Sequence, residues 1–182
     1  MATDGLVTVS ERRSTRKLFT DGQYREGPRE TPVRRYTAPV SEVVVKRLGP
    51  GDEAEAQRFD GAFDESVEPD LVARYLADQR HHLVAAYADD EPAGVATATE
   101  ILRPDKPPEL FLNELMVMQA FRRRGVASSL LAEIRRLATE RGCVSIWVLT
   151  GEDNDGGIAT YRAAGGQRVE GTTVMFEIDP AG

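Results

Sequence analysis

Hydrophobic positions from residue 41 onward follow two spacings, which together predict a mixed α/β domain. Short apolar runs between turn residues predict strands, whereas apolar residues three or four positions apart predict amphipathic helices. The resulting order is strand, two helices, three strands, helix, strand, helix and strand. The predicted strands are 43–48, 82–87, 94–101, 109–118, 145–150 and 172–178, and the predicted helices are 52–59, 69–77, 126–141 and 157–164.

The segment 126–141 has the clearest helical pattern. Its apolar residues form one stripe, and its charged residues lie off that stripe. The stripe consists of Val126, Leu130, Leu131, Ile134, Leu137 and Ala138. Gly142 follows at a position where glycine commonly ends a helix.

Residues 1–40 show no sustained period and are rich in Arg, Thr, Ser, Gly and Pro. This composition predicts a basic, flexible N-terminal arm. The alternative is an interaction arm that docks on an acidic partner or on a second copy of the chain, which would make a homodimer. The predicted organisation is the arm at 1–40 and one domain of ordinary size at 41–182.

Charge is distributed unevenly between these two parts. The chain carries a formal net charge of −7, and residues 1–40 hold eight basic and five acidic side chains, so the remaining residues carry −10. An acidic domain attracts cationic ligands and repels nucleic acid. We therefore expect a small cationic partner and no nucleic acid.

The numbers of cysteine and histidine residues and the lengths of the apolar runs exclude further classes of protein. Cys143 is the single cysteine, and His81 and His82 are the only histidines, so neither a disulfide scaffold nor a metal site is expected. Both histidines are interpreted as surface or strand-edge residues. No apolar run approaches the roughly 20 residues that span a bilayer, and the N-terminal segment lacks the long apolar region of a secretory signal. The expected location is the reducing cytoplasm, with no membrane partner.

A basic, glycine-containing loop lies between the predicted strand 109–118 and the predicted helix 126–141. Backbone N–H groups at the start of a helix bind phosphate, and glycine lets the backbone approach the ligand closely. Neighbouring arginines add charge-assisted contacts. The alternative is an ordinary basic turn that begins a helix. The candidate cofactor residues of this loop are Arg122, Arg123, Arg124, Gly125, Val126 and Ala127.

This loop is similar to the Arg/Gln-x-x-Gly-x-Gly/Ala signature of the GNAT acetyltransferase superfamily. The preceding strand LNELMV (112–117) and the segment IATYRAAGG (158–166) also resemble that superfamily. The resemblance implies an α/β GNAT fold with a mixed, mostly antiparallel central sheet, flanking helices and splayed central strands. It further implies acetyl-CoA as cosubstrate, with the pyrophosphate on the loop and the pantetheine along Leu115, Met116 and Val117.

Scattered shorter segments resemble type I aminoglycoside 3-N-acetyltransferases. They are KRLGP (46–50), the loop at 154–155 and VMFEIDP (174–180). Two residues depart from that family's pattern, because Glu114 stands where it usually has Asp and Asn154 where it has a second acidic residue. The resemblance implies 3-N-acetylation of an aminoglycoside, which is an antibiotic-resistance activity.

Acetyl transfer to an amine needs a base for the ammonium group and benefits from a proton donor for the leaving thiolate. Glu114 interrupts an apolar strand where such a base would lie, and the resemblance gives Tyr161 the role of proton donor. The alternatives are a carboxylate paired with an arginine or a backbone donor, and an ordinary core tyrosine.

The loop at 152–155 carries several carboxylates, which could attract a polycation or could form a solvated turn. The predicted substrate residues are Asn113, Asp153 and Asp155, and Asn154 is predicted to contact the cofactor.

The function that these residues favour is transfer of an acetyl group from acetyl-CoA to a cationic primary amine, with an aminoglycoside as the first candidate. The same chemistry on a polyamine, an amino sugar or a protein amine is the second. A GNAT-fold module that binds acyl-CoA or a partner without turnover is the third.

Overall fold

A computed structural model of the chain describes residues 42–169 and 171. The chain divides into two units, 1–36 and 37–182, and the described residues all belong to the second. The predicted arm at 1–40 and the predicted strand at 172–178 lie outside the described residues.

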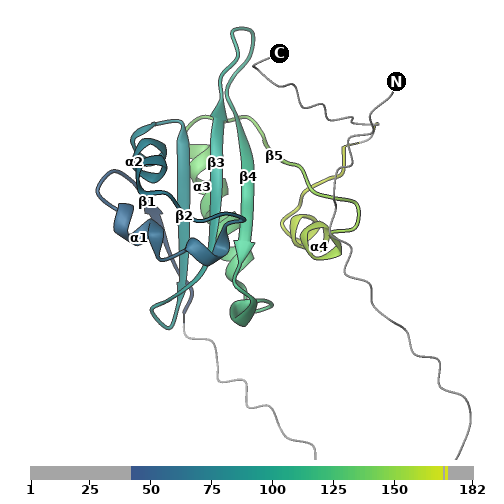
Figure 1. Ribbon diagram of the computed structural model, residues 1–182. Coiled ribbons are helices and arrows are strands. Elements are labelled where there is room, and N and C mark those ends of the chain that lie inside the picture. Colours follow the sequence, from purple (N-terminus) through teal and green to yellow (C-terminus); the bar gives the residue numbers. More distant parts are fainter. Residues whose placement is uncertain (1–41, 170, 172–182) are drawn as a thin grey trace, which may run out of the picture. The chain divides into compact units, whose positions relative to one another are not determined.

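The described strands form one five-stranded sheet in the order β1-β2-β3-β4-β5 (Figure 1). Neighbours from β1 to β4 are antiparallel, and β5 is parallel to β4 because helix α3 connects them. The strands are β1 (Val44–Leu48), β2 (His81–Ala88), β3 (Glu91–Ile101), β4 (Glu109–Val117) and β5 (Ile146–Val148). These five predicted strands are confirmed, with shifts of up to three residues at their ends.

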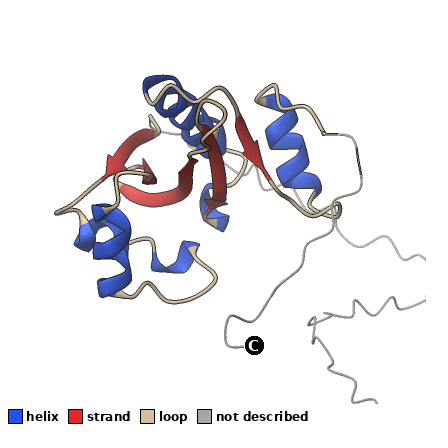
Figure 2. Ribbon diagram, turned by 90° about the horizontal axis from the view of Figure 1, so that it is seen from above, coloured by secondary structure: helices blue, strands red, loops and turns tan. Residues whose placement is uncertain are grey.

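Helices cover both faces of this sheet (Figure 2). Helices α1 and α2 pack on one face and α3 on the other. The helices are α1 (Glu53–Gln57), α2 (Pro69–Ala77), α3 (Val126–Glu140) and α4 (Asp155–Ala163). All four were predicted, whereas the short 3-10 turns at Asp60–Ala62 and Gln119–Phe121 were not.

The start of α4 shows why a boundary differed from its prediction. The helix begins at Asp155, two residues before the predicted start, because Asn154 caps it. Asn154 Oδ1 accepts a hydrogen bond from the Gly157 N–H at 2.9 Å. Such a cap satisfies a donor that the first helical turn leaves free.

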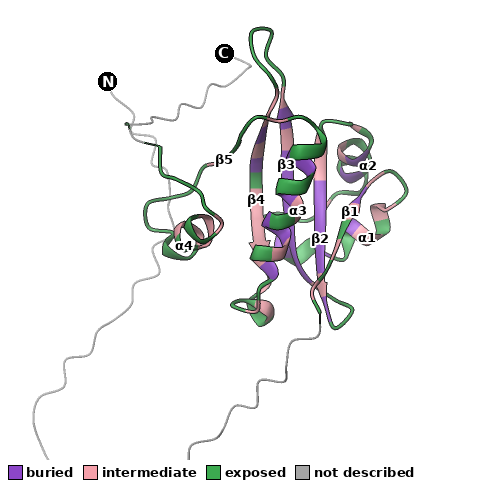
Figure 3. Ribbon diagram, turned by 180° about the vertical axis from the view of Figure 1, so that it is seen from behind, coloured by how far each residue is buried: buried purple, intermediate pink, exposed green. Residues whose placement is uncertain are grey.

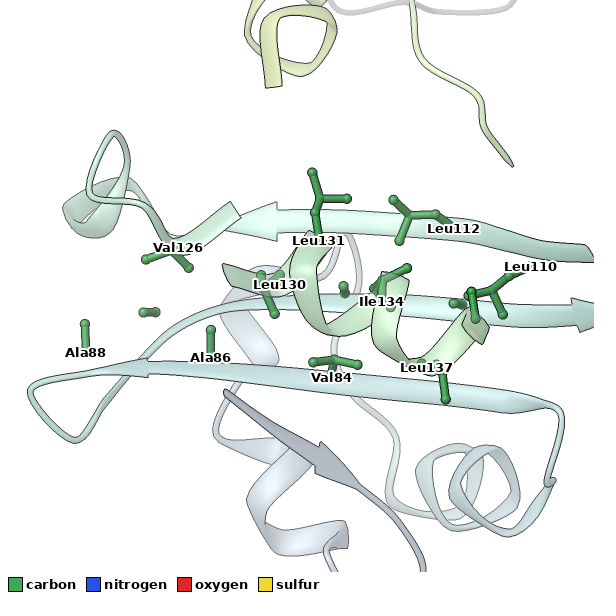
Figure 4. Packing of buried hydrophobic residues seen from close by; sticks show 14 residues of the cluster. Val84, Ala86, Ala88, Leu110, Leu112, Val126, Leu130, Leu131, Ile134 and Leu137 are labelled. Carbon is green, nitrogen blue, oxygen red and sulfur yellow. The ribbon is translucent and has the colours of Figure 1, made fainter. Parts of the chain in front are cut away.

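Two cores result, one on each face of the sheet. Successive residues of β2 point to opposite faces, so Leu83 and Ala85 pack with α1 and α2, whereas Val84 and Ala86 pack with α3. Figure 3 shows the middle of β2 and of β3 buried. The predicted stripe of α3 is buried at every position, and Figure 4 shows it against the sheet.

A β-bulge in β4 changes which side chains face α1 and α2. Register pairs Thr97 with Glu114 and Ala98 with Leu112, so Asn113 is the extra residue. Asn113 and Glu114, although adjacent, therefore both line the cavity on the α1/α2 face. Bulges re-aim side chains in this way beside many active sites.

Strands β4 and β5 separate soon after they meet. They pair only over Leu110–Leu112 and Ile146–Val148, so residues 113–117 of β4 have no β5 partner on that edge. On the opposite edge, Gly94 allows a close approach, since a Cβ there would lie 2.5 Å from the Met116 oxygen. The predicted splay of the central strands is thus present, next to tightly packed β3 and β4.

A buried polar cluster ties the end of α3 to the sheet. Glu100 is 8% exposed and accepts a hydrogen bond from Arg141 Nε, and its Oε1 lies 2.7 Å from His82 Nε2. Burial lowers the pKa of His82, and the attraction of Glu100 only partly opposes that effect. The expectation of a surface or edge role for His82 is therefore wrong.

This cluster predicts an acid-sensitive contribution to stability. Because His82 has a lowered pKa in the folded protein, the unfolded chain takes up the proton first as the pH falls through the ordinary value of 6.5. Stability from neutral His82 is therefore complete above that value and is lost below it. Urea unfolding at pH 8 and pH 5.5 should show a smaller pH effect in His82→Gln, whose amide keeps a donor for Glu100. An equal pH effect in both proteins would contradict this assignment.

Candidate active site

A cavity of about 410 Å³ opens on the α1/α2 face of the sheet. Residues from the segment before α2, from α2 and from three strands converge on it. Its polar and aromatic lining includes Glu65, Glu68, Tyr75, His81, Thr97, Thr99, Asn113 and Glu114. The cavity lies beside the bulge of β4 and is lined by residues that are far apart in the sequence.

The lining of this cavity is largely apolar, and the carboxylic acid side chains in it are those of glutamates. Glu65, Glu68 and Glu114 contribute three carboxylates, and no lysine or arginine of the described ranges lines it. Carboxylates without basic neighbours produce a negative potential that favours ammonium groups. The sequence analysis did not single out Glu65 or Glu68, because two exposed glutamates in a loop carry no distinguishing pattern.

Glu114 has one hydrogen bond within the described part of the chain. Thr97 Oγ1 donates to its Oε2 at 3.1 Å, and no described arginine or lysine forms an ion pair with it. The alternative of an arginine-paired carboxylate is therefore not what the described residues show. A partly buried carboxylate with a free oxygen in an acidic cavity can accept a proton from a bound ammonium group.

Tyr75 and His81 form an aromatic wall of the same cavity. Their ring centroids lie 4.9 Å apart, and the Tyr75 hydroxyl donates to the His82 oxygen at 3.2 Å. Burial raises the pKa of Tyr75 to about 12, so the phenol stays neutral. His81 thus lines the cavity. The sequence analysis expected a surface or edge residue, because a single sequence does not show which elements pack beside a strand.

The loop before α3 has the geometry of an anion site. Gly125 adopts φ +86°, no side chain caps the helix, and its first turn holds no acidic residue. The first intrahelical bond runs from Ser129 N–H to Gly125 O, so the N–H groups of residues 126–128 lack a helical partner. No described atom lies within 4 Å of a Cβ built on Gly125. The residues present therefore fit a pyrophosphate.

The three arginines of this loop have different surroundings. Arg122 Nε donates to the Val117 oxygen at 3.1 Å, and Arg124 lies 3.6 Å from Asp89 and over the Phe121 ring. Arg123 has φ +60° and makes no hydrogen bond or ion pair with the described residues. Arg123 is thus the arginine whose charge is least engaged by this part of the chain.

Tyr161 lies on the other side of the sheet from Glu114. It lines a second cavity of about 470 Å³ between α3, β5 and α4, and it packs against the core that contains the α3 stripe. Burial raises the pKa of Tyr161, which keeps its hydroxyl protonated. Strands β4 and β5 do not pair beyond Leu112, so Leu115, Met116 and Val117 lie on an edge of β4 that has no described strand partner.

The remaining predicted residues lie outside both of these cavities. Asp153 and Asp155 are exposed in the loop and first turn of α4, and Asn154 caps that helix and donates to Thr150 at 2.9 Å. The structure thus brings Asn113 and Glu114 together, but not Asp153 or Asp155 with them. Their predicted binding roles stay predictions.

The described ranges contain neither a candidate metal site nor a candidate membrane span. No group of three or more His, Cys, Asp or Glu side chains there could hold a metal ion. None of the helices there is long and apolar enough to cross a bilayer.

The sequence of this chain matches one family model, that of the acetyltransferase (GNAT) family, over residues 52–165. The aminoglycoside N(6′)-acetyltransferase type 1 of Salmonella typhimurium is 30% identical over 129 residues, which cover 69% of this chain and 81% of the relative. The N-alpha-acetyltransferase RimI of Mycobacterium tuberculosis is 33% identical over 138 residues, which cover 73% and 84%.

Solved structures share the fold. An aminoglycoside acetyltransferase from an uncultured soil metagenomic sample, in complex with sisomicin, has a TM-score of 0.69 at 15% identity and covers 75% of this chain and 95% of its own. The aminoglycoside N-acetyltransferase AAC(6′)-Iy in complex with CoA has a TM-score of 0.64 at 22% identity, with 76% and 95% covered. The predicted GNAT fold is confirmed.

Proposed function

The chain belongs to the GNAT acetyltransferase family, and from this premise we propose that it moves the acetyl group of acetyl-CoA to a primary amine of an aminoglycoside. That it is an acetyltransferase follows from the family. The observation that carries the choice of acceptor is the cavity with three carboxylates and no basic residue among its described lining. Aminoglycosides carry several ammonium groups on linked rings, so they match the charge of this cavity.

The loop at 122–127 and the free edge of β4 would hold the cofactor. The N–H groups at the start of α3 and the Arg123 guanidinium would bind the pyrophosphate, and the backbone of residues 115–117 would pair with the pantetheine. Acetyl-CoA, when bound, supplies a thioester whose acetyl group an amine can accept. The N–H of Met116 or Val117 would polarise the thioester carbonyl.

Two side chains would move protons, one from each face of the sheet. Glu114 would accept a proton from the acceptor ammonium, which frees the nitrogen lone pair for attack. Tyr161 would donate its hydroxyl proton to the departing thiolate. The cavity that contains Glu114 would be the acceptor cavity, and the acceptor would meet the thioester beside residues 113–117 of β4, where β5 no longer pairs with it.

The position of acetylation is a separate question. The short resemblances in the sequence predict the 3-N position, whereas the Salmonella relative is a 6′ enzyme by name. Product analysis that locates the acetyl group decides between these two positions. Location in the cytoplasm and a homodimer stay predictions of the sequence.

A protein amine is the second candidate acceptor, and one comparison favours it. The relative named N-alpha-acetyltransferase is 33% identical to this chain. A peptide N-terminus offers a single ammonium group, however, so it would use less of the acidic lining.

A panel of acceptors tests the proposal. Purified full-length protein is incubated with acetyl-CoA and an aminoglycoside, spermidine, glucosamine or a peptide with a free N-terminal alanine, and thiol release is followed. We expect the highest kcat/KM with the aminoglycoside, and mass spectrometry then locates the acetyl group. A higher kcat/KM with the peptide or spermidine would overturn the choice of acceptor, and binding of acetyl-CoA without thiol release would overturn catalysis.

A further inference from the structure

Thr97 carries a hydroxyl into the interior beneath the acceptor cavity. Within the described ranges, the buried polar or charged residues are Thr97, at 5% exposure, and Glu100. The neighbours Ala96 and Ala98 face α3, whereas Thr97 faces α1 and α2 and lines the cavity. Its cross-strand partner in the β3–β4 register is Glu114.

The hydrogen bond between these two residues accounts for the buried hydroxyl. A hydroxyl removed from water costs free energy unless it is bonded, and valine would fill the same place in a strand without that cost. The Thr97 hydroxyl donates to Glu114 Oε2 at 3.1 Å. The hydroxyl of Tyr75, on the facing helix, also approaches Thr97, but it donates its own proton to the His82 oxygen.

We propose that Thr97 is the positioning residue for Glu114 and fixes which carboxylate oxygen meets the acceptor. The inference rests on the proposed function of Glu114 as the base. A glutamate has three rotatable side-chain bonds, and anchoring Oε2 restricts the carboxylate. Oε1 then accepts one proton from the acceptor ammonium, the amine attacks with the freed pair, and Thr97 keeps its own proton throughout.

Comparing four side chains at position 97 distinguishes the effect of the hydroxyl group from the effect of the methyl group. Threonine and serine keep the hydroxyl, whereas Thr97→Val and Thr97→Ala lose it. The comparison of serine with alanine keeps the test decisive if the valine variant does not fold.

Steady-state kinetics with the best acceptor, together with thermal unfolding, give the readout. We expect Thr97→Val and Thr97→Ala to lower kcat roughly 10- to 100-fold, as a misplaced catalytic group does, with the KM for acetyl-CoA unchanged. Thr97→Ser should recover most of the rate. A serine variant as slow as alanine, or a valine variant with normal kcat, would overturn the proposal.

A double-mutant cycle separates failure of this inference from failure of the proposed function. If Thr97 acts through Glu114, Thr97→Val should cause no further loss in a Glu114→Gln background. Normal rates in the single variant Glu114→Gln would show that Glu114 is not the base, and they would overturn this inference as well. A slow Glu114→Gln, with Thr97→Val adding its full effect to it, would overturn the positioning role and leave the base intact.

Discussion

Glu114→Gln is expected to lower kcat/KM for the acceptor by about 10²- to 10⁴-fold, the usual contribution of a general base. Glutamine keeps the shape of the side chain and can still interact with the Thr97 hydroxyl, but it cannot accept a proton from the ammonium group. The loss should be greatest at low pH, where the acceptor amine is most fully protonated. Thiol-release rates for wild type and variant between pH 6 and pH 9 provide the measurement.

A second glutamate of β4 supplies the matched control for this experiment. Glu109 lies at the other end of the strand, outside the acceptor cavity, and forms ion pairs with Arg103 and Lys106. Glu109→Gln should therefore leave kcat unchanged, and the KM for acetyl-CoA should be normal in both variants. Near-normal rates in Glu114→Gln across the pH range would mean that this carboxylate is not the base.

Local sequence patterns correctly predicted those elements that bury one face and expose the other. The stripe of α3 is such a case, because one apolar face at helical spacing fixes both the helix and its buried side. The candidate cofactor loop at 122–127 could also be found in the sequence, since a glycine before a helix start is a local motif. Its positive φ at Gly125 agrees with that interpretation.

The acceptor cavity could not be predicted in the same way. Its residues come from the segment before α2 and from three strands, so their proximity depends on strand register and on the bulge at Asn113. A one-residue change of register would turn Thr97 away from Glu114. For this reason Thr97 and His81 gained a role only once β3, β4 and α2 were placed together.

The two faces of the sheet also divide the candidate site in a way that the sequence does not show. Glu114 and Tyr161 both lie near apolar segments in the sequence, yet they line cavities on opposite faces. Strand β4 contributes to both cavities near the point where its pairing with β5 ends, because Asn113 and Glu114 line one cavity and Leu112 lines the other. Under the proposed function, a base and an acid would therefore act on one reaction from opposite faces of the sheet.

Gly125→Val should raise the KM for acetyl-CoA by roughly 10- to 100-fold, the equivalent of one lost hydrogen bond to a charged group. Gly125 has φ +86°, which a β-branched residue rarely adopts, and a Cβ there would project into space that no described residue fills. That space borders the free N–H groups at the start of α3. The variant would therefore disturb the pyrophosphate site in two ways, by turning the backbone and by filling the approach.

A control substitution at Gly142 distinguishes the effect of backbone strain from the effect on the pyrophosphate site. It follows the other end of the same helix, has φ +69°, and likewise has no described atom within 4 Å of a Cβ. Gly142→Val should lose a similar amount of stability in thermal unfolding, because both substitutions force valine into the left-handed region. Only Gly125→Val should weaken acetyl-CoA binding, measured by calorimetry as well as by KM. If the two variants lose affinity equally, the effect comes from strain in α3, and the pyrophosphate must bind elsewhere.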